Sequence, residues 1–301
     1  MAIGLITNQD SSRREDLIDI VSNVSPSETP LLTGLPMGQA AKQTLHEYTI
    51  DTYAAAADDA ATEAAGFTAV DLTQPTRGNN VTQIFKEDIL VSETEIAVAG
   101  VVEPYNYQIQ KNMVQHAKNI ELALMAGSRA SGSSGVARRL AGVINSISTN
   151  LTTRVSGTSL GQKDFDDIMQ MIWTGAAGTG TGYVATEVYT GAQLRRDISG
   201  FTTSVTRFVA QDDKKLINPV DVYESNFGVH KIFLHRNVPS TANNLSLVAI
   251  NPQFFRKSYL RPTHLLPLAP DGDRRRGSII SELTLESRAE NSNAFVNGFT
   301  S

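Results

Sequence analysis

Apolar side chains recur every three or four residues over one long stretch of the chain, which predicts a one-sided helix. Glu103 precedes Pro104, and proline is favoured in the first turn of a helix. The apolar face comprises Tyr105, Ile109, Met113, Ala117, Ile120 and Leu124. Gly127 and the run Ser131–Gly135 mark its end, so we predict a helix to about Arg129, roughly 40 Å long at about 1.5 Å per residue.

Shorter helices are predicted on the same grounds. Ser12 and Glu15 form a capping box, and the apolar stripe behind it comprises Leu17, Ile20, Val21 and Val24. Asp164 is placed to cap a second helix that Gly175 ends, and the apolar face of this helix comprises Phe165, Ile168, Met169 and Ile172. Residues 192–198 are predicted to form a third short helix.

Alternating or β-branched runs predict the strands. These runs are residues 44–50, 81–85, 89–98, 183–189, 229–234, 245–250 and 279–285. In the last run, Leu283 and Leu285 are expected to face the core, whereas Glu282, Thr284 and Glu286 are expected to face water. The chain is therefore expected to mix helices and strands.

The span between the first two predicted strands has an unusual composition. Tyr53 to Ala65 contains eight alanines, and no Lys or Arg occurs between Lys42 and Arg77. Its acids, which have no nearby base, are Asp51, Asp58, Asp59, Glu63 and Asp71. We predict a long two-stranded projection with an acidic tip. Because an isolated hairpin is marginal in water, the projection must rest on another surface.

Composition and charge narrow the function classes. The 301 residues include 26 Lys or Arg against 31 Asp or Glu, a formal net charge of -5. Proteins that neutralise nucleic-acid phosphates carry a basic excess or a basic stripe, so tight wrapping of DNA is not expected. The lack of cysteine excludes disulfides, zinc-thiolate sites and a cysteine nucleophile. No apolar run suffices for a signal peptide or a membrane span, so we expect a cytoplasmic chain.

One catalytic motif is present. Residues 157–161 have the pattern G-x-S-x-G around Ser159, which is typical of a nucleophile elbow. The preceding run is too polar for a buried elbow strand, and the following helix is expected to start several residues late. A serine hydrolase using Ser159 is therefore the alternative function, and trapping by a fluorophosphonate reagent would decide it.

Other motifs give no indication of bound groups. The glycine run 178–182 lacks the Gly-Lys-Ser/Thr ending of a phosphate-binding loop, so a turn is predicted. The histidines stand at positions 46, 116, 230, 235 and 264, without the spacing of zinc hydrolases. His230 and His235, five residues apart, are expected to point to opposite faces of a strand. We expect no metal and no cofactor.

The arginine run Arg274, Arg275 and Arg276 follows the turn signal Pro270–Gly272. It allows two interpretations, a solvated loop or a docking site for acids of a neighbouring chain. The acidic tip supplies such acids. The hypothetical assembly contacts are therefore Asp51, Asp58, Asp59, Glu63, Asp71, Arg274, Arg275 and Arg276.

Several segments, taken in order, carry a family resemblance. Near the N-terminus they are residues 29–32 (TPLL), 46–52 (HEYTIDT) and 54–56 (AAA). Further along they are residues 82–85 (TQIF), 91–94 (VSET), Glu103 with 107–108 (YQ) and Lys111, 137–142 (ARRLAG), 282–286 (ELTLE) and 293–295 (NAF). Together these segments resemble the tailed-bacteriophage major capsid proteins of the Hong Kong 97-type fold.

The resemblance implies an α+β fold divided into four parts. Residues 1–41 would be an N-terminal arm, and residues 42–98 would be an extended β-hairpin loop. A peripheral domain with the long spine helix would comprise residues 99–140 and 255–290. A mixed α/β axial domain would comprise residues 141–254 and 291–301.

The resemblance also implies a function. The protein would be a structural subunit, not an enzyme, that self-assembles through pentamers and hexamers into an icosahedral head shell enclosing double-stranded DNA. Its partners would be further copies of itself, a portal, and separate scaffold or decoration proteins, with no membrane and no sequence-specific DNA binding. It would be located in the virion, after assembly in the host cytoplasm. A nanocompartment shell of the same fold is a second alternative.

The chain departs from the family pattern in two respects. It has no fused scaffolding segment, which implies a separate scaffold, none, or earlier processing. Residues 44–76 contain no lysine, so a covalent cross-link through the projection is not expected, and Lys42 or Lys86 at its base are poor substitutes.

Overall fold

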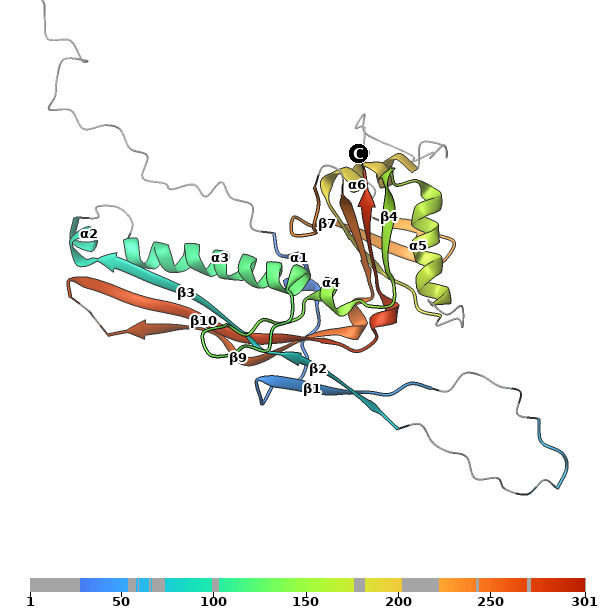
Figure 1. Ribbon diagram of the computed structural model, residues 1–301. Helices are drawn as coiled ribbons and strands as arrows, with labels where there is room; N and C mark the ends of the chain where they lie inside the picture. The colour runs from blue at the N-terminus through green and yellow to red at the C-terminus, as the bar shows by residue number, and fades with distance from the viewer. Residues whose placement is uncertain are drawn as a thin grey trace, which may run out of the picture.

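The computed structural model places a long helix on a three-stranded sheet, with a six-stranded sheet beside them (Figure 1). It describes residues 28–53, 58, 60–64, 66, 74–98, 103–175, 182–201, 222–241, 244–269 and 272–300. The helix predicted within residues 12–24, the AAA segment at 54–56 and most of the glycine run 178–182 lie outside these residues. None of the described helices is both long and apolar enough to cross a membrane.

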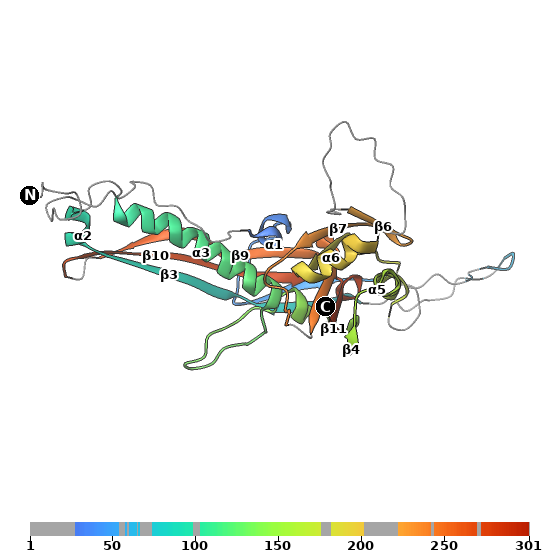
Figure 2. The same cartoon turned by 90° about the horizontal axis from the view of Figure 1, so that it is seen from above.

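Helix α3, Pro104–Ala126, is the predicted long helix, and its 23 residues span about 35 Å. It begins after Glu103, as predicted, and ends slightly earlier than expected, directly before Gly127. Its buried face includes Tyr105, Ile120 and Leu124 and packs on the three-stranded sheet (Figure 2). The apolar periodicity therefore identified the helix. Five of the six residues of the predicted apolar face are buried or half-buried, whereas Met113 is 40% exposed.

The three-stranded sheet has β10 (Arg274–Ser287) at its centre, between β3 (Gln83–Ser92) and β9 (Phe255–Leu268), and both pairings are antiparallel. Helix α2, Glu93–Val98, follows β3 directly. The strand predicted for residues 89–98 is therefore wrong beyond Ser92. Glu93 and Glu95 lie in the first turn of α2, where acidic side chains stabilise a helix N-terminus.

The six-stranded sheet has the order β4-β11-β8-β5-β7-β6. The strands are β4 (Leu151–Thr158), β11 (Ala294–Phe299), β8 (Leu245–Ile250), β5 (Glu187–Thr190), β7 (Gly228–Leu234) and β6 (Val222–Ser225). Every residue of β8 is buried. Leu247 and Ala249 belong to one core and Val248 and Ile250 to the other. The uniform apolar character of β8 arises because both faces of the sheet are covered.

Helices α5 (Gln162–Thr174) and α6 (Ala192–Gly200) pack on one face of this sheet. The apolar face predicted for α5 is confirmed, since its four residues Phe165, Ile168, Met169 and Ile172 are buried. Asp164 lies inside the helix and accepts a hydrogen bond from Gly161 N at 3.2 Å. Short helical turns complete the chain: α4 (Val143–Ser146), η3 (Pro252–Phe254) and η4 (Glu290–Ser292). The strand predicted for residues 183–189 is shortened to begin at Glu187.

The N-terminal part consists of a short helix and a projecting hairpin. Helix α1, Pro30–Gly34, contacts α3. Strands β1 (Leu45–Ile50) and β2 (Thr76–Val81) pair antiparallel in a separate two-stranded sheet that extends away from the core (Figure 1). A two-stranded projection is therefore present, but its second strand is Thr76–Val81 and not the predicted run 81–85. Beyond Thr82 that run belongs to the three-stranded sheet.

The face of β10 that was expected to contact water is instead buried. Glu282, Thr284 and Glu286 are 3%, 0% and 1% exposed. The base of the hairpin lies over them, because β2 contacts β10. The prediction that these residues and the leucines lie on opposite faces of the strand is correct. The segment that covers the polar face comes from about 200 residues earlier in the chain, so no local sequence pattern indicates that contact.

Candidate assembly surfaces

The projecting hairpin is attached to the core through the buried carboxylate of Glu286. Its Oε1 lies 3.0 Å from Nε2 of His46 on β1 and accepts a hydrogen bond from Ser258 Oγ on β9 at 2.7 Å. Its Oε2 accepts a hydrogen bond from Arg288 Nη2 at 2.8 Å. One carboxylate thus joins β1, β9 and β10.

Hydrogen bonds between side chains of the hairpin base and the backbone of β10 and of the segment after α3 also attach the hairpin to the core. Asn80 Nδ2 donates to the carbonyl oxygens of Leu285 at 2.7 Å and Ala141 at 3.0 Å. Tyr48 Oη accepts a hydrogen bond from Ser287 N at 3.1 Å. The base is therefore fixed, whereas Asp51–Tyr53 beyond β1 are exposed.

The Glu286 contacts predict an acid sensitivity. Burial alone would raise the pKa of Glu286, but hydrogen bonds from Ser258, His46 and Arg288 outweigh it and leave the pKa below its ordinary value. A carboxylate with a lowered folded-state pKa stabilises the fold above its unfolded pKa of about 4.3, and that stability is lost as pH falls through the folded-state pKa.

We therefore expect the wild-type chain to lose more stability on acidification below about pH 5 than Glu286→Gln does. Urea unfolding followed as a function of pH measures this difference. Glu95→Gln, at an exposed position, is the control and should keep the wild-type pH dependence. Parallel curves for wild type and Glu286→Gln would contradict the assignment.

A second buried carboxylate fixes the loop that follows α3. Glu282 Oε1 accepts hydrogen bonds from Thr82 Oγ1 at 2.7 Å and from Arg138 Nη2 at 2.9 Å. Its Oε2 accepts one from Arg261 Nε at 3.0 Å. Two arginines therefore compensate the buried charge, as burial of a carboxylate requires.

The predicted acidic contacts are only partly described. Asp51, Asp58 and Glu63 are exposed, and Asp59 and Asp71 lie outside the described residues. Figure 1 shows the segment that contains Glu63 at the far end of the projection, remote from both larger sheets. The described acids are therefore available to a neighbouring molecule.

The arginine run begins strand β10, so its interpretation as a solvated loop is wrong. Arg275 Nε lies 3.6 Å from Glu93 Oε1, and its Nη1 lies 3.4 Å from Glu103 Oε1. Its guanidinium lies 5.5 Å from the ring centre of Tyr105, a cation–π distance. Arg275 therefore has partners within its own subunit. Arg274 and Arg276 alternate to the other face of the strand.

The face of the three-stranded sheet that is turned away from α3 carries exposed apolar side chains. Ile84, Leu90 and Leu266 are 48%, 56% and 42% exposed. Arg274 and Arg276 lie on the same face, because paired residues of antiparallel strands point to the same side. We call this the outer sheet face. The ion-paired Lys86 and Asp88 lie between Ile84 and Leu90 on this face. Exposed apolar side chains beside charges are typical of a protein interface.

Ser159 does not have the surroundings of a catalytic serine. It is exposed, β4 before it is an edge strand, and α5 starts only at Gln162. The hydrogen-bond partners of the five histidines are other groups, namely Glu286 for His46, Ser281 for His116, Ser225 and Ala185 for His230, Glu121 for His235, and Pro262 for His264. No group of three or more His, Asp or Glu in the described part of the chain is arranged to hold a metal.

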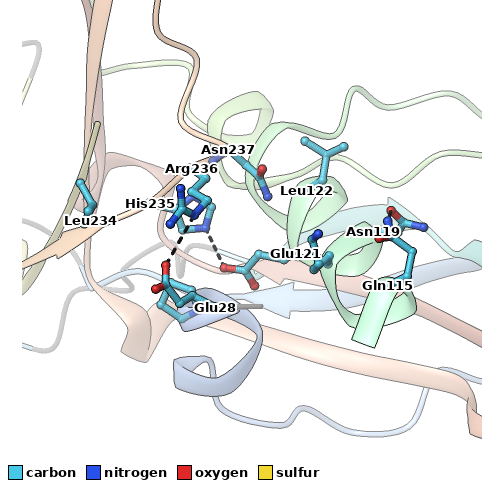
Figure 3. A pocket seen from close by; sticks show the side chains of 11 residues that line it. Glu28, Gln115, Asn119, Glu121, Leu122, Leu234, His235, Arg236 and Asn237 are labelled. Carbon is cyan, nitrogen blue, oxygen red and sulfur yellow. Dashed lines mark hydrogen bonds and ion pairs between the residues drawn. The ribbon is translucent and has the colours of Figure 1, made fainter. Parts of the chain in front are cut away.

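The prediction for His230 and His235 is confirmed. The His230 ring packs 5.7 Å from the ring of Phe165 on α5, whereas His235 reaches Glu121 on α3 (Figure 3). The side chains of the two histidines therefore point to opposite faces of the six-stranded sheet.

Glu121 joins three parts of the subunit. Its Oε1 accepts a hydrogen bond from Leu31 N at 2.8 Å and lies 2.7 Å from His235 Nε2. Its Oε2 accepts a hydrogen bond from Leu32 N at 2.6 Å. The side chain is 2% exposed. Helix α1, the spine helix α3 and the end of β7 therefore meet at one carboxylate (Figure 3).

The sequence patterns did not predict that these three glutamates are buried. Glu121 follows Ile120 on the apolar side of α3, and an acid beside such a stripe was an available signal. Glu282 and Glu286 were noticed but assigned to water. In each case the partner comes from a distant segment, so the sequence pattern alone does not identify it.

One of the comparisons with known proteins identifies a family. A family model described as SU10 major capsid protein matches residues 4–300. A search of curated proteins gave no significant match.

Solved structures share the fold. The capsid asymmetric unit of cyanophage A-1(L) is 15% identical, with a TM-score of 0.67 over 98% of this chain and 100% of that chain. The capsid of Myoviridae phage XM1 is 10% identical, with a TM-score of 0.64 over 99% of both chains. The holo-SrpI encapsulin complex from Synechococcus elongatus is 9% identical, with a TM-score of 0.61 over 100% of this chain and 97% of that chain.

Proposed function

Since this chain belongs to the SU10 major capsid protein family, it is a structural subunit of a bacteriophage shell, and we propose that it assembles through contacts between its projecting hairpin and a neighbouring subunit. The hairpin carries the proposal. The described residues of its distal part are exposed and include the acids Asp51, Asp58 and Glu63, while its base is fixed by buried hydrogen bonds, so it presents a surface to another molecule.

The complementary surface lies at the opposite end of the molecule. The arginine run begins β10 at the far tip of the three-stranded sheet, and the hairpin extends in the other direction (Figure 1). The two charged regions of one chain are therefore too far apart to meet each other. We propose that Asp51, Asp58, Asp59, Glu63 and Asp71 of one copy lie against the Arg274–Arg276 region and the outer sheet face of the next copy.

We further propose the division of the subunit given above. The arm would comprise residues 1–41, the extended loop 42–98, the peripheral domain 99–140 and 255–290, and the axial domain 141–254 and 291–301. The long α3 and the compact six-stranded sheet support this division. Contacts of the arm, the loop and the axial edge would each be weak, and shell closure would combine them through effective concentration.

The assembled state would be an icosahedral shell of pentamers and hexamers around double-stranded DNA. A portal and a packaging motor would fill such a shell, and separate scaffold or decoration proteins would assist where assembly needs them. The net charge of -5 supports a wall that does not condense DNA by itself. No catalytic role is proposed for Ser159, and a fluorophosphonate reagent should leave it unlabelled.

Negative-stain microscopy of the purified full-length chain tests this function. Closed shells or capsomer rings are the expected result. Shells that contain a protein cargo and no DNA when they are purified from the producing cells would favour a nanocompartment. A uniform small monomer with esterase activity would overturn the proposal.

Charge reversal tests the proposed contact. We expect Arg274→Glu, Arg275→Glu and Arg276→Glu together to weaken assembly, because the acids of the neighbouring hairpin would then meet like charge. A second variant changes only Arg274 and Arg276, which keeps Arg275 with its partners Glu93 and Glu103. Light scattering of assembly reactions at several salt concentrations gives the readout.

The matched control carries an equal charge change elsewhere, through Lys111→Glu, Arg139→Glu and Lys163→Glu at exposed positions. The control should assemble like the wild type. Equal assembly by the arginine variants and the wild type would refute the charge contact.

A further inference from the structure

The loop between α3 and α4 forms a second, smaller hairpin that projects beside the three-stranded sheet (Figure 2). Ala130 and Arg139 exchange two backbone hydrogen bonds of 3.0 Å, and Ser133 and Val136 exchange two more, of 3.2 and 3.0 Å, across the turn. We call residues 130–139 the side hairpin. Its paired backbone makes it a preformed surface.

A groove of about 360 Å³ lies between the side hairpin and strand β3. Its apolar walls include Ile84 and Val136, which are 48% and 58% exposed. Ile84 lies at one end of the outer sheet face. Exposed apolar side chains gain free energy when another apolar surface covers them. The groove is therefore suited to an apolar side chain.

The groove also has a surplus of positive charge. Arg138 lines it and donates from Nη2 to Glu282 Oε1 at 2.9 Å. Arg261 Nε donates to the other oxygen of Glu282 at 3.0 Å, so two guanidinium groups share one buried carboxylate. The nearby Arg129 donates to a neutral group, Asn79 Oδ1, at 2.6 Å. An occupant with an acid beside an apolar group therefore complements the groove.

The start of the distal part of the projecting hairpin has this chemistry. Tyr53 is fully exposed, and the exposed acid Asp51 precedes it by two residues. Aromatic side chains are favoured as anchors at the centre of protein interfaces, and a buried one covers about 150–250 Å². Strand β1 carries Tyr53 away from Asn79, which contacts the side hairpin region of the same subunit (Figure 1). The groove is therefore filled by a second copy.

The spacing of the contacts on the outer sheet face agrees with such an anchor. Ile84 and Ser92, the strand partner of Arg274, are eight residues apart on β3, about 26 Å at roughly 3.3 Å per residue. The nine steps from Tyr53 to Thr62 span at most about 32 Å. With Tyr53 beside Ile84, a neighbouring hairpin can therefore bring its acidic end to the arginine run.

We propose that Tyr53 of one copy docks in the groove between the side hairpin and β3 of a second copy. Its ring would pack between Ile84 and Val136, and Asp51 would lie near Arg138. The inference rests on the hairpin contact proposed above. It adds the residue that anchors the hairpin and sets its register on the neighbouring subunit.

Cysteine cross-linking between copies tests this register, because the natural chain contains no cysteine. Thr52→Cys is mixed with Ser133→Cys before assembly. Both positions are exposed, and the substitutions retain Tyr53 and the apolar walls of the groove. The control mixes Thr52→Cys with Val229→Cys, an exposed position on β7. Mild oxidation should link positions 52 and 133 at least ten times faster than 52 and 229, as measured by mass spectrometry of the linked peptides.

A third mixture, Thr62→Cys with Ser92→Cys, distinguishes the anchor from the hairpin contact on which it rests. A link between positions 62 and 92 without one between 52 and 133 would overturn the anchor and retain the hairpin contact. Assembled shells with neither link would overturn both.

Substitution of Tyr53 provides a second readout. Light scattering should show assembly at least tenfold slower for Tyr53→Ala, whereas Tyr53→Phe should stay within about twofold of the wild type, because burial of the ring supplies the contact. The urea midpoint of the subunit should be the same in both variants, since Tyr53 is fully exposed. Wild-type assembly by Tyr53→Ala would overturn the anchor.

Discussion

Replacing residues 51–75 by Asn-Gly is expected to abolish shell assembly and leave a folded subunit. The replacement joins the paired residues Ile50 and Thr76 through a two-residue turn suited to an antiparallel hairpin. It retains His46, Tyr48 and Asn80, which hold the hairpin base to β10. The proposed contact with the neighbouring subunit is lost, whereas the contacts of the core remain.

The thermal unfolding midpoint should not fall below the wild-type value, because the contacts of the hairpin base remain and a shorter loop costs less entropy to close. Microscopy and light scattering report assembly. A second variant keeps the full length and changes only Asp58→Asn, Asp59→Asn and Glu63→Gln. It distinguishes the effect of the acidic charges from the effect of the length of the hairpin. Normal shells from the shortened chain would refute the role of the hairpin.

Glu121→Ala is expected to destabilise the subunit by about 3–5 kcal/mol. The substitution removes the acceptor for Leu31 N and Leu32 N and leaves the buried His235 ring without its carboxylate. Buried donors without a partner each cost about 1–3 kcal/mol. Helix α1 should detach more readily, because two of its first amides lose their acceptor.

Urea unfolding measures the free-energy change, and limited proteolysis near α1 reports the local effect. Glu95→Ala, at an exposed glutamate of α2, is the control and should lie within about 0.5 kcal/mol of wild type. If Glu121→Ala and Glu95→Ala unfold at the same urea concentration, Glu121 is not the joint described above.

The parts of the fold that follow local periodicity were predictable from sequence. Helix α3, the four buried apolar residues of α5 and the strand β8 each have the pattern typical of their element, although Met113 of the predicted α3 face is exposed. The first strand of the hairpin was also predictable, since an alternating run precedes a span too polar and too rich in alanine to form a core. Its partner β2 was not, because TRGNNV has no strand pattern. In these segments, the burial of the element produces the spacing of apolar residues in the sequence.

The parts that depend on distant pairing were not predictable in this way. Glu282 and Glu286 alternate with leucines exactly as solvent-facing residues do, and only the hairpin base and Arg138 show that they are buried. The arginine run followed a turn signal, and its pairing with residues 90–92 of β3 placed it in a strand. Charged residues occur both in loops and at the ends of strands, so the composition of the arginine run did not show which of the two it forms.

Strand β10 has a mechanical consequence for a subunit under load. It runs unbroken for 14 residues, about 45 Å at roughly 3.3 Å per residue, and its end leads into the turn before β11 of the other sheet. It pairs with β3 from Arg274 to Leu283 and with β9 from Arg276 to Ser287, and the β9 ladder has register shifts on either side of Glu282. A tensile force along the subunit would load these ladders in shear, with many hydrogen bonds resisting at once. Peeling, in which bonds break one at a time, would need a force across the strand.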